Sequence, residues 1–150
     1  NWEKIKKQEK KSPEQKNKSI LDSIPEALPA LYRASKVQKK AARVGFDWPD
    51  TQGVLKKISE EIGEFEACQK SQPEKARDEF GDILFSLVNL ARKIQIDPED
   101  ALRLATKKFE QRFRLVENQV NASGKEFTEF SLAELDRFWE NSKNQLSQKN

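Results

Sequence analysis

The feature that most limits the fold is the spacing of the apolar residues, which recur every three or four positions between helix-breaking residues. Between Pro29 and Gly45 this spacing is followed by Leu31, Ala34, Val37, Ala41 and Val44. No segment shows a convincing alternation of apolar and polar residues of the kind that marks a half-buried strand. The sequence therefore predicts an all-α fold.

Proline, glycine and capping residues divide the chain into five predicted helices. These are expected at about residues 29–44, 51–70, 73–94, 98–120 and 132–146. Pro98 follows Asp97, which suits a helix N-cap with proline at the first helical position. Ser131 and Glu134 have the spacing of a capping box. The connections are short, so we expect an antiparallel helical bundle of four main helices plus a C-terminal helix.

Charge separates a short leader from the rest of the chain. Residues 1–20 contain seven Lys and three Glu, a net charge of +4, whereas the whole chain carries +3, so the remaining residues sum to −1. We therefore expect residues 1–24 to be a basic, partly disordered leader or inter-domain segment and residues 25–150 to form one domain. That domain shows no broad basic face, so a nucleic-acid partner is not expected.

The residue types that are missing exclude several kinds of chemistry. The chain has no His and a single Cys, Cys68. A Ser-His-Asp triad, a zincin motif and an intramolecular disulfide are therefore impossible, and a zinc site is disfavoured. Any metal must be held by oxygen ligands, which favours Mg²⁺, Mn²⁺ or Ca²⁺. No apolar run reaches membrane-spanning length and no signal peptide opens the chain, so a cytoplasmic protein without a membrane partner is expected.

Acidic residues occupy unusual positions on the second and third predicted helices. Glu61 falls inside the apolar arc of its helix, with Glu60 and Glu64 along the edge of that arc. On the third helix a narrow polar stripe runs beside the apolar arc and contains Glu79, Asp82, Ser86, Asn89 and Lys93.

A short break joins these two helices, so they should pack antiparallel, with Glu61 and Glu64 facing Glu79 and Asp82. Converging carboxylates repel one another, and a divalent cation removes that cost. The alternative is a solvated acidic face with chance spacing. A di-iron site of the ferritin type is excluded because it needs His ligands.

Basic and aromatic residues lie where they could hold a phosphorylated ligand. Lys57 precedes Glu61 by one turn, and Lys108 and Arg112 lie one turn apart in an apolar sector of the fourth helix. Each of these cations suits either a phosphate grip or a salt bridge to the acidic residues. Trp139 and Lys143 are likewise one turn apart, on the last predicted helix, although a tryptophan at such a position more often belongs to a core. Asn89 suits either a base edge or a buried polar contact.

The acidic residues also match a known signature. Glu60-Glu61-Ile-Gly-Glu64 followed by Glu79-Phe-Gly-Asp82 resembles the EExxE and ExxD motifs of the MazG family. The resemblance extends over residues 1–146 and includes the blocks 28–31, 41–48, 80–85, 88–92 and 108–113. Within the family, the chain resembles the C-terminal domain of members that carry two such domains.

This resemblance implies a dimeric all-α enzyme that cuts (d)NTPs to (d)NMP and pyrophosphate and so cleans the nucleotide pool. It implies Mg²⁺, with Mn²⁺ as an alternative, held by Glu61, Glu64, Glu79 and Asp82. It assigns nucleotide contacts to Lys108, Arg112, Trp139 and Lys143. Glu60 or a metal-bound Glu is the expected general base. The other hypotheses are a non-catalytic helical interaction module with a cation-binding acidic cluster and a nucleic-acid adaptor that binds through the Lys-rich tail.

Overall fold

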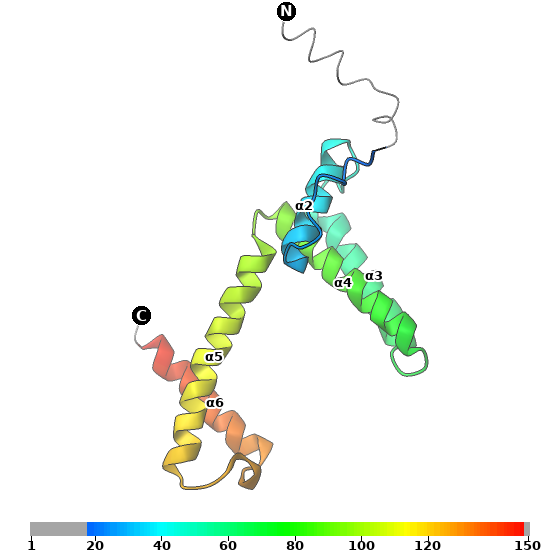
Figure 1. The fold of residues 1–150 in the computed structure, drawn as a ribbon. Coiled ribbons are helices and arrows are strands. Elements are labelled where there is room, and N and C mark those ends of the chain that lie inside the picture. Colours follow the sequence, from blue (N-terminus) through cyan, green and yellow to red (C-terminus); the bar gives the residue numbers. More distant parts are fainter. Residues whose placement is uncertain (1–17, 149–150) are drawn as a thin grey trace, which may run out of the picture. The chain divides into compact units, whose positions relative to one another are not determined.

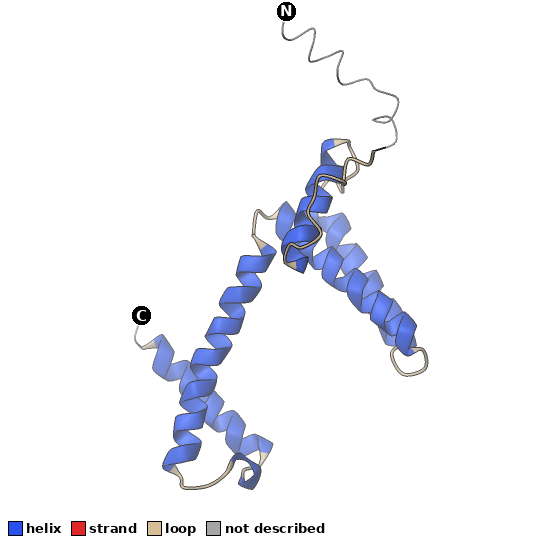
Figure 2. Cartoon of the chain, viewed as in Figure 1, coloured by secondary structure: helices blue, strands red, loops and turns tan. Residues whose placement is uncertain are grey.

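A computed structural model of the protein describes residues 18–148, so the prediction for residues 1–17 lies outside the described residues. The described residues form α-helices and one 3-10 helix, without strands (Figure 2). The α-helices are α2 (Ala30–Arg43), α3 (Thr51–Cys68), α4 (Pro73–Lys93), α5 (Pro98–Ala122) and α6 (Leu132–Ser147). The all-α prediction is confirmed, and each predicted helix lies within two residues of its observed bounds.

The chain divides into two compact units, one ending at Glu99 and the other beginning at Asp100. Each unit has its own buried residues and is described by itself. Among the described residues, no helix combines the length and the apolar character that crossing a membrane would require.

In the first unit, α3 and α4 lie side by side in opposite directions, joined by residues 69–72, and α2 packs against α4 (Figure 1). Pro73 begins α4 at a position where a missing N–H costs nothing. The buried apolar residues of this unit are Ile24, Val54, Cys68, Ala76 and Val88. A polar contact also joins α2 to α4, because Gln38 Nε2 donates to the carbonyl of Phe85 at 2.9 Å.

The loop between α2 and α3 depends on two glycines. Gly45 has a φ of 89°, in the left-handed region that favours glycine, and it ends α2 as predicted. Asp50 caps α3 by accepting a hydrogen bond from the Gly53 backbone N–H at 3.1 Å. The ring of Trp48 lies over Gly53 so closely that a Cβ there would be 2.9 Å from Trp48 Cε3. Gly53 therefore allows the Trp48 ring to pack on the first turn of α3.

In the second unit, α6 crosses α5 after a short 3-10 helix, Phe127–Glu129. The predicted capping box is present, since Ser131 Oγ accepts from the Glu134 N–H at 3.2 Å and Glu134 Oε2 accepts from the Ser131 N–H at 2.8 Å. The backbone N–H and the hydroxyl of Ser131 both donate to Glu134 Oε2, and these two bonds lower the pKa of Glu134. Gln119 on α5 donates to the carbonyl of Phe138 on α6 at 3.1 Å. The apolar core here is small, with Val116 and Val120 buried.

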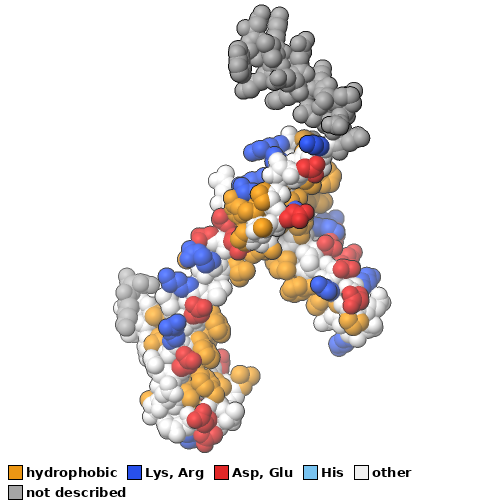
Figure 3. All heavy atoms as spheres, in the orientation of Figure 1, with side chains coloured by type: hydrophobic (Ala, Val, Ile, Leu, Met, Phe, Trp, Pro, Cys, Tyr) orange, Lys and Arg blue, Asp and Glu red, His pale blue; other side chains and the backbone are white. Residues whose placement is uncertain are grey.

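Many large apolar side chains remain exposed on both units, and Figure 3 shows hydrophobic side chains at the surface of each. On α3 and α4 they include Leu55, Ile62, Phe80, Leu84, Phe85 and Leu87. On α5 they include Leu102, Leu104, Phe109 and Phe113. Apolar surface on this scale usually marks a contact with another surface.

Candidate functional site

Three carboxylates from α3 and α4 converge in the first unit, and we call Glu61, Glu79 and Asp82 the carboxylate cluster. Each contributes one oxygen, and these oxygens all lie within 4.8 Å of one another. Glu61 is buried with an exposed fraction of 3%, Glu79 is half-buried and Asp82 is exposed. The antiparallel packing predicted for these helices brings the three side chains together.

Glu64 borders the cluster. Partial burial raises the pKa of Glu79, and the neighbouring carboxylates of Glu64 and Glu61 raise it further. A protonated Glu79 can donate a hydrogen bond to Glu64, which is why proton binding relieves the repulsion. Glu60 is exposed on α3 and does not belong to the group of converging oxygens.

Lys57 lies one turn before Glu61 and forms an ion pair with Glu61 Oε1. The hydrogen bond to Glu61 raises the pKa of Lys57, so this ammonium stays protonated. Of the two interpretations of Lys57 from the sequence, the structure therefore contains the salt bridge. Lys75 also acts on Glu79 by its charge, but among the described residues only Lys57 is shown in an ion pair with the cluster, so the cluster keeps a capacity for a further cation.

The donor set suits a hard divalent cation. Mg²⁺ binds oxygen ligands at about 2.1 Å, so two ligands on opposite sides of the ion are about 4.2 Å apart. The oxygens of the carboxylate cluster lie within 4.8 Å. Side-chain adjustments of under about 1 Å would therefore bring them to Mg²⁺ distances.

Asn89, further along α4, takes part in a network that links α4 to the α2–α3 loop. Arg92 Nη2 donates to Asn89 Oδ1 at 2.7 Å, and Arg92 Nη1 donates to Asp47 Oδ2 at 2.9 Å. Lys93 Nζ also donates to Asp47 Oδ2, at 2.7 Å. Hydrogen bonds from Arg92 and Lys93 hold the pKa of Asp47 well below its usual range, against the opposing effect of burial.

Sequence reasoning missed this network. It included Asp47 only in the family-like block of residues 41–48, and it placed Lys93 in the polar stripe of α4 without a partner. The available signal was an aspartate in a short Gly-Phe-Asp-Trp-Pro connection, where a carboxylate close to a neighbouring helix end needs a cation.

The predicted nucleotide contacts of α5 and α6 lie in the second unit. The guanidinium of Arg112 lies 5.8 Å from the ring centre of Trp139, and the ring of Phe109 lies 5.2 Å from that same ring. We call Phe109, Arg112 and Trp139 the cation–aromatic group. Lys108 is exposed, and Lys143 forms an ion pair with Glu140 at 2.7 Å. Trp139 thus packs against Phe109 and contacts Arg112, and its predicted contact with a nucleotide stays a prediction.

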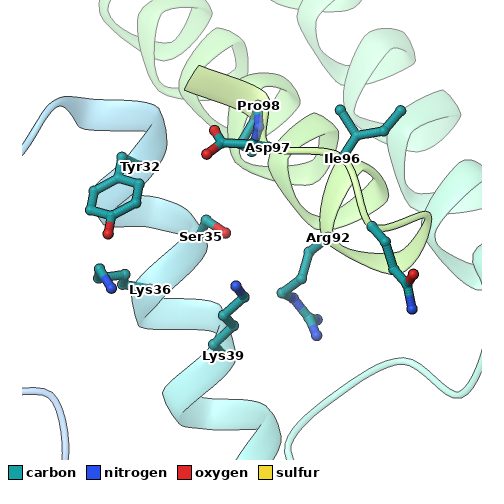
Figure 4. A pocket seen from close by; sticks show the side chains of 9 residues that line it. Tyr32, Ser35, Lys36, Lys39, Arg92, Ile96, Asp97 and Pro98 are labelled. Atoms are coloured by element: carbon teal, nitrogen blue, oxygen red, sulfur yellow. The ribbon is translucent and has the colours of Figure 1, made fainter. Parts of the chain in front are cut away.

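A separate hollow of about 370 Å³ opens between α2 and the connection from α4 to α5 (Figure 4). It is lined by Tyr32, Ser35, Lys36, Lys39, Arg92, Gln95, Ile96, Asp97 and Pro98. None of these is a predicted site residue, and the carboxylate cluster does not line this hollow. Figure 4 shows Arg92 extending from α4 along its edge.

Comparison with known proteins agrees with the motif. Residues 50–116 match the family described as the MazG nucleotide pyrophosphohydrolase domain, and this segment contains all four predicted metal ligands. The nucleoside triphosphate pyrophosphohydrolase/pyrophosphatase MazG of Thermotoga maritima is 43% identical over 142 residues, which are 95% of this chain and 54% of the relative.

The nucleoside triphosphate pyrophosphohydrolase of Escherichia coli K12 is 46% identical over 147 residues, 96% of this chain and 55% of the relative. The uncharacterized protein YabN of Bacillus subtilis is 46% identical over 145 residues, 95% of this chain and 29% of the relative. The chain thus spans about half the length of the first two relatives. From the matched segment and these identities, the chain belongs to the MazG nucleotide pyrophosphohydrolase family.

Proposed function

We propose that the protein hydrolyses (d)NTPs to (d)NMP and pyrophosphate and thereby removes unwanted nucleotides from the pool. The convergence of the Glu61, Glu79 and Asp82 oxygens within 4.8 Å is the observation that carries the proposal. Membership of the family and the names of the two bacterial relatives support the same reaction class. Because the substrates of this reaction come from the nucleotide pool, we propose that the protein acts in the cytoplasm.

The proposed cofactor is Mg²⁺, with Mn²⁺ as the alternative, held by Glu61, Glu64, Glu79 and Asp82. When bound, it would draw charge from the α-phosphoryl group and orient a water for in-line attack. The water oxygen forms a bond to the α-phosphorus while the bond to the pyrophosphate oxygen breaks. Glu60 or one carboxylate of the cluster takes the proton of that water, and a Glu60→Gln variant separates these two assignments.

The basic residues have the complementary role of neutralising the pyrophosphate that leaves. We propose Lys108 and Arg112 for this role, with Lys57 and Lys143 assisting. Trp139 supports Arg112, whose guanidinium carbon lies 5.8 Å from the centre of the Trp139 ring. Asn89 is proposed to contact the nucleoside.

The deciding experiment is turnover of the eight common NTPs and dNTPs with Mg²⁺, scored for pyrophosphate against orthophosphate. Release of pyrophosphate with the monophosphate, lost on chelation, is the expected result. Orthophosphate release would point to a different bond. If the protein gains thermal stability from Mg²⁺ but releases neither product, it is a helical interaction module that binds a structural cation.

We further propose that the protein acts as a homodimer. Phe80, Leu84 and Leu87 follow one another along one side of α4 and are 51%, 41% and 44% exposed, respectively. Contact with a second copy would remove this apolar stripe from water. Gel filtration with light scattering should give twice the chain mass, and Leu84→Glu should shift it toward the monomer. A monomeric wild type would overturn the dimer.

A further inference from the structure

Arg92 is held between two acceptors. Its Nη1 donates to Asp47 Oδ2 at 2.9 Å, and its Nη2 donates both to Asp47 Oδ1 and to Asn89 Oδ1, the latter at 2.7 Å. The side chain is only 12% exposed. A guanidinium fixed by a paired contact with a carboxylate has little freedom to rotate, so its remaining contact is also fixed.

This contact determines how the Asn89 amide is oriented. A guanidinium carries only donors, so the Asn89 side chain must turn its oxygen toward Arg92. Its Nδ2, with two N–H donors, then points away from Arg92. Asn89 cannot reverse the amide without placing N–H groups against a cation and losing the bond to Arg92.

Asn89 lies on the side of α4 that carries the carboxylate cluster. Asn89 follows Asp82 by seven residues, two helical turns on the same face, which is a rise of about 10 Å. A nucleotide whose phosphates are held at Asp82 can extend its nucleoside along α4 over such a distance. Asn89 is half-buried, so a contact made there is partly shielded from water.

We propose that Arg92 is a positioning residue that presets the Asn89 amide as a hydrogen-bond donor, so that the nucleoside must offer an acceptor to it. This inference rests on the proposed function of the carboxylate cluster. The acceptor is an oxygen of the sugar or a carbonyl of the base. A nucleoside group that can only donate is disfavoured at this position.

The test is Arg92→Lys. A lysine keeps a positive charge beside Asp47, but a single ammonium lacks the planar fork that reaches two partners at once. Arg92→Lys and Asn89→Ala should each raise KM for the preferred nucleotide by about fivefold, with kcat changed less than about twofold, since one preset hydrogen bond is lost. The double variant should be no worse than Asn89→Ala alone, because both changes remove the same contact.

Lys93→Met is the matched control. Lys93 donates to Asp47 and to the carbonyl of Trp48, but not to Asn89. Its loss should lower Tm by loosening the loop, and any effect on KM should multiply with that of Asn89→Ala. Two results overturn the inference: Arg92→Lys with a wild-type KM, or a double variant in which the separate losses multiply.

The same single and double variants, compared by their affinity for a nucleotide instead of by KM, separate this inference from the proposed function. If the wild type binds a nonhydrolysable nucleoside triphosphate with Mg²⁺ but turns over no nucleotide, the proposed function fails. The positioning role of Arg92 is still supported in that case if the double variant loses no more affinity than Asn89→Ala alone. If the wild type hydrolyses nucleotides but the cycle shows no coupling, the inference on Arg92 fails alone. A wild type that neither binds nor hydrolyses nucleotides overturns both.

Discussion

The carboxylate cluster of the first unit and the cation–aromatic group of the second unit differ in how well their charges are balanced. In the cluster, Glu61, Glu79 and Asp82 bring like charges together, and Lys57 forms an ion pair with Glu61. Partial burial raises the pKa of Glu79, and the neighbouring carboxylates of Glu64 and Glu61 raise it further. In the cation–aromatic group, Arg112 already rests against the electron-rich face of Trp139.

This difference predicts different roles. A group of like charges gains free energy when an opposite charge arrives, so the carboxylate cluster is suited to capturing a cation. A cation that is already stabilised by a ring gains less from a ligand but is held in one orientation. Substitutions in the cluster should therefore abolish the chemistry, whereas substitutions in the cation–aromatic group should weaken nucleotide binding.

The largest expected effect is that of removing one acid of the cluster. Glu61→Ala and Asp82→Ala should each lower kcat by about 100-fold or more, because a catalytic metal contributes several kcal/mol to transition-state stabilisation. Pyrophosphate release measures the loss, and circular dichroism should show that the helices remain. Near-wild-type turnover in either variant would refute the assignment of that acid as a metal ligand.

The next effect concerns Arg112. Arg112→Ala should raise KM by about tenfold or more, since it removes charge-assisted hydrogen bonds to phosphate, and kcat should fall less than in the acid variants. Arg112→Lys is the control, because it keeps the charge but loses the flat contact with Trp139. If both variants matched the wild type in KM, Arg112 would be only a partner of the Trp139 ring.

A third prediction uses the raised pKa of Glu79. Unfolding returns this pKa to its ordinary value, so the folded protein binds the proton more tightly. The stability that proton binding gives is present at low pH and is lost as pH rises through the folded pKa. At pH 8 without metal, Glu79→Gln should therefore raise Tm, because the neutral amide avoids the repulsion.

The same variant should gain little stability from Mg²⁺, whereas the wild type should gain more as pH rises and Glu79 loses its proton. Thermal melts in chelator and in Mg²⁺, at pH 5 and pH 8, measure both effects. Glu66→Gln makes the same charge change at an exposed position of α3 outside the cluster and should leave both melts near the wild type. A lower Tm for Glu79→Gln in chelator would contradict the repulsion.

The contrast between the two units also explains what the sequence could predict. The positions of Glu61, Glu79 and Asp82 follow from two periodic helices and one short connection, which together fix direction and facing. These rules are local, so they hold without knowledge of the rest of the fold. The pairing of Lys57 with Glu61 is likewise a one-turn contact, and it was one of the two alternatives.

The network around Arg92 and Asp47 could not be derived in this way. The two residues are 45 positions apart and meet because the α2–α3 loop folds back along α4. Loop direction depends on the left-handed Gly45 and on the Trp48 ring above Gly53, neither of which helical periodicity describes. The contact of Arg112 with Trp139 joins two helices whose crossing angle depends on packing.

The smallest expected effect tests whether Lys143 serves the nucleotide or only its neighbour. Lys143 is ion-paired with Glu140 at 2.7 Å, and the two side chains are 38% and 55% exposed, so the pair itself should contribute little stability. If Lys143 contacts phosphate, Lys143→Gln should raise KM by about two- to threefold, because an exposed charge is screened by water. Glu140→Gln should instead leave KM unchanged or lower it, since Lys143 is released. Equal increases in KM from both variants would mean that the pair holds α6 in place and that nucleotide binding in the second unit depends on the cation–aromatic group.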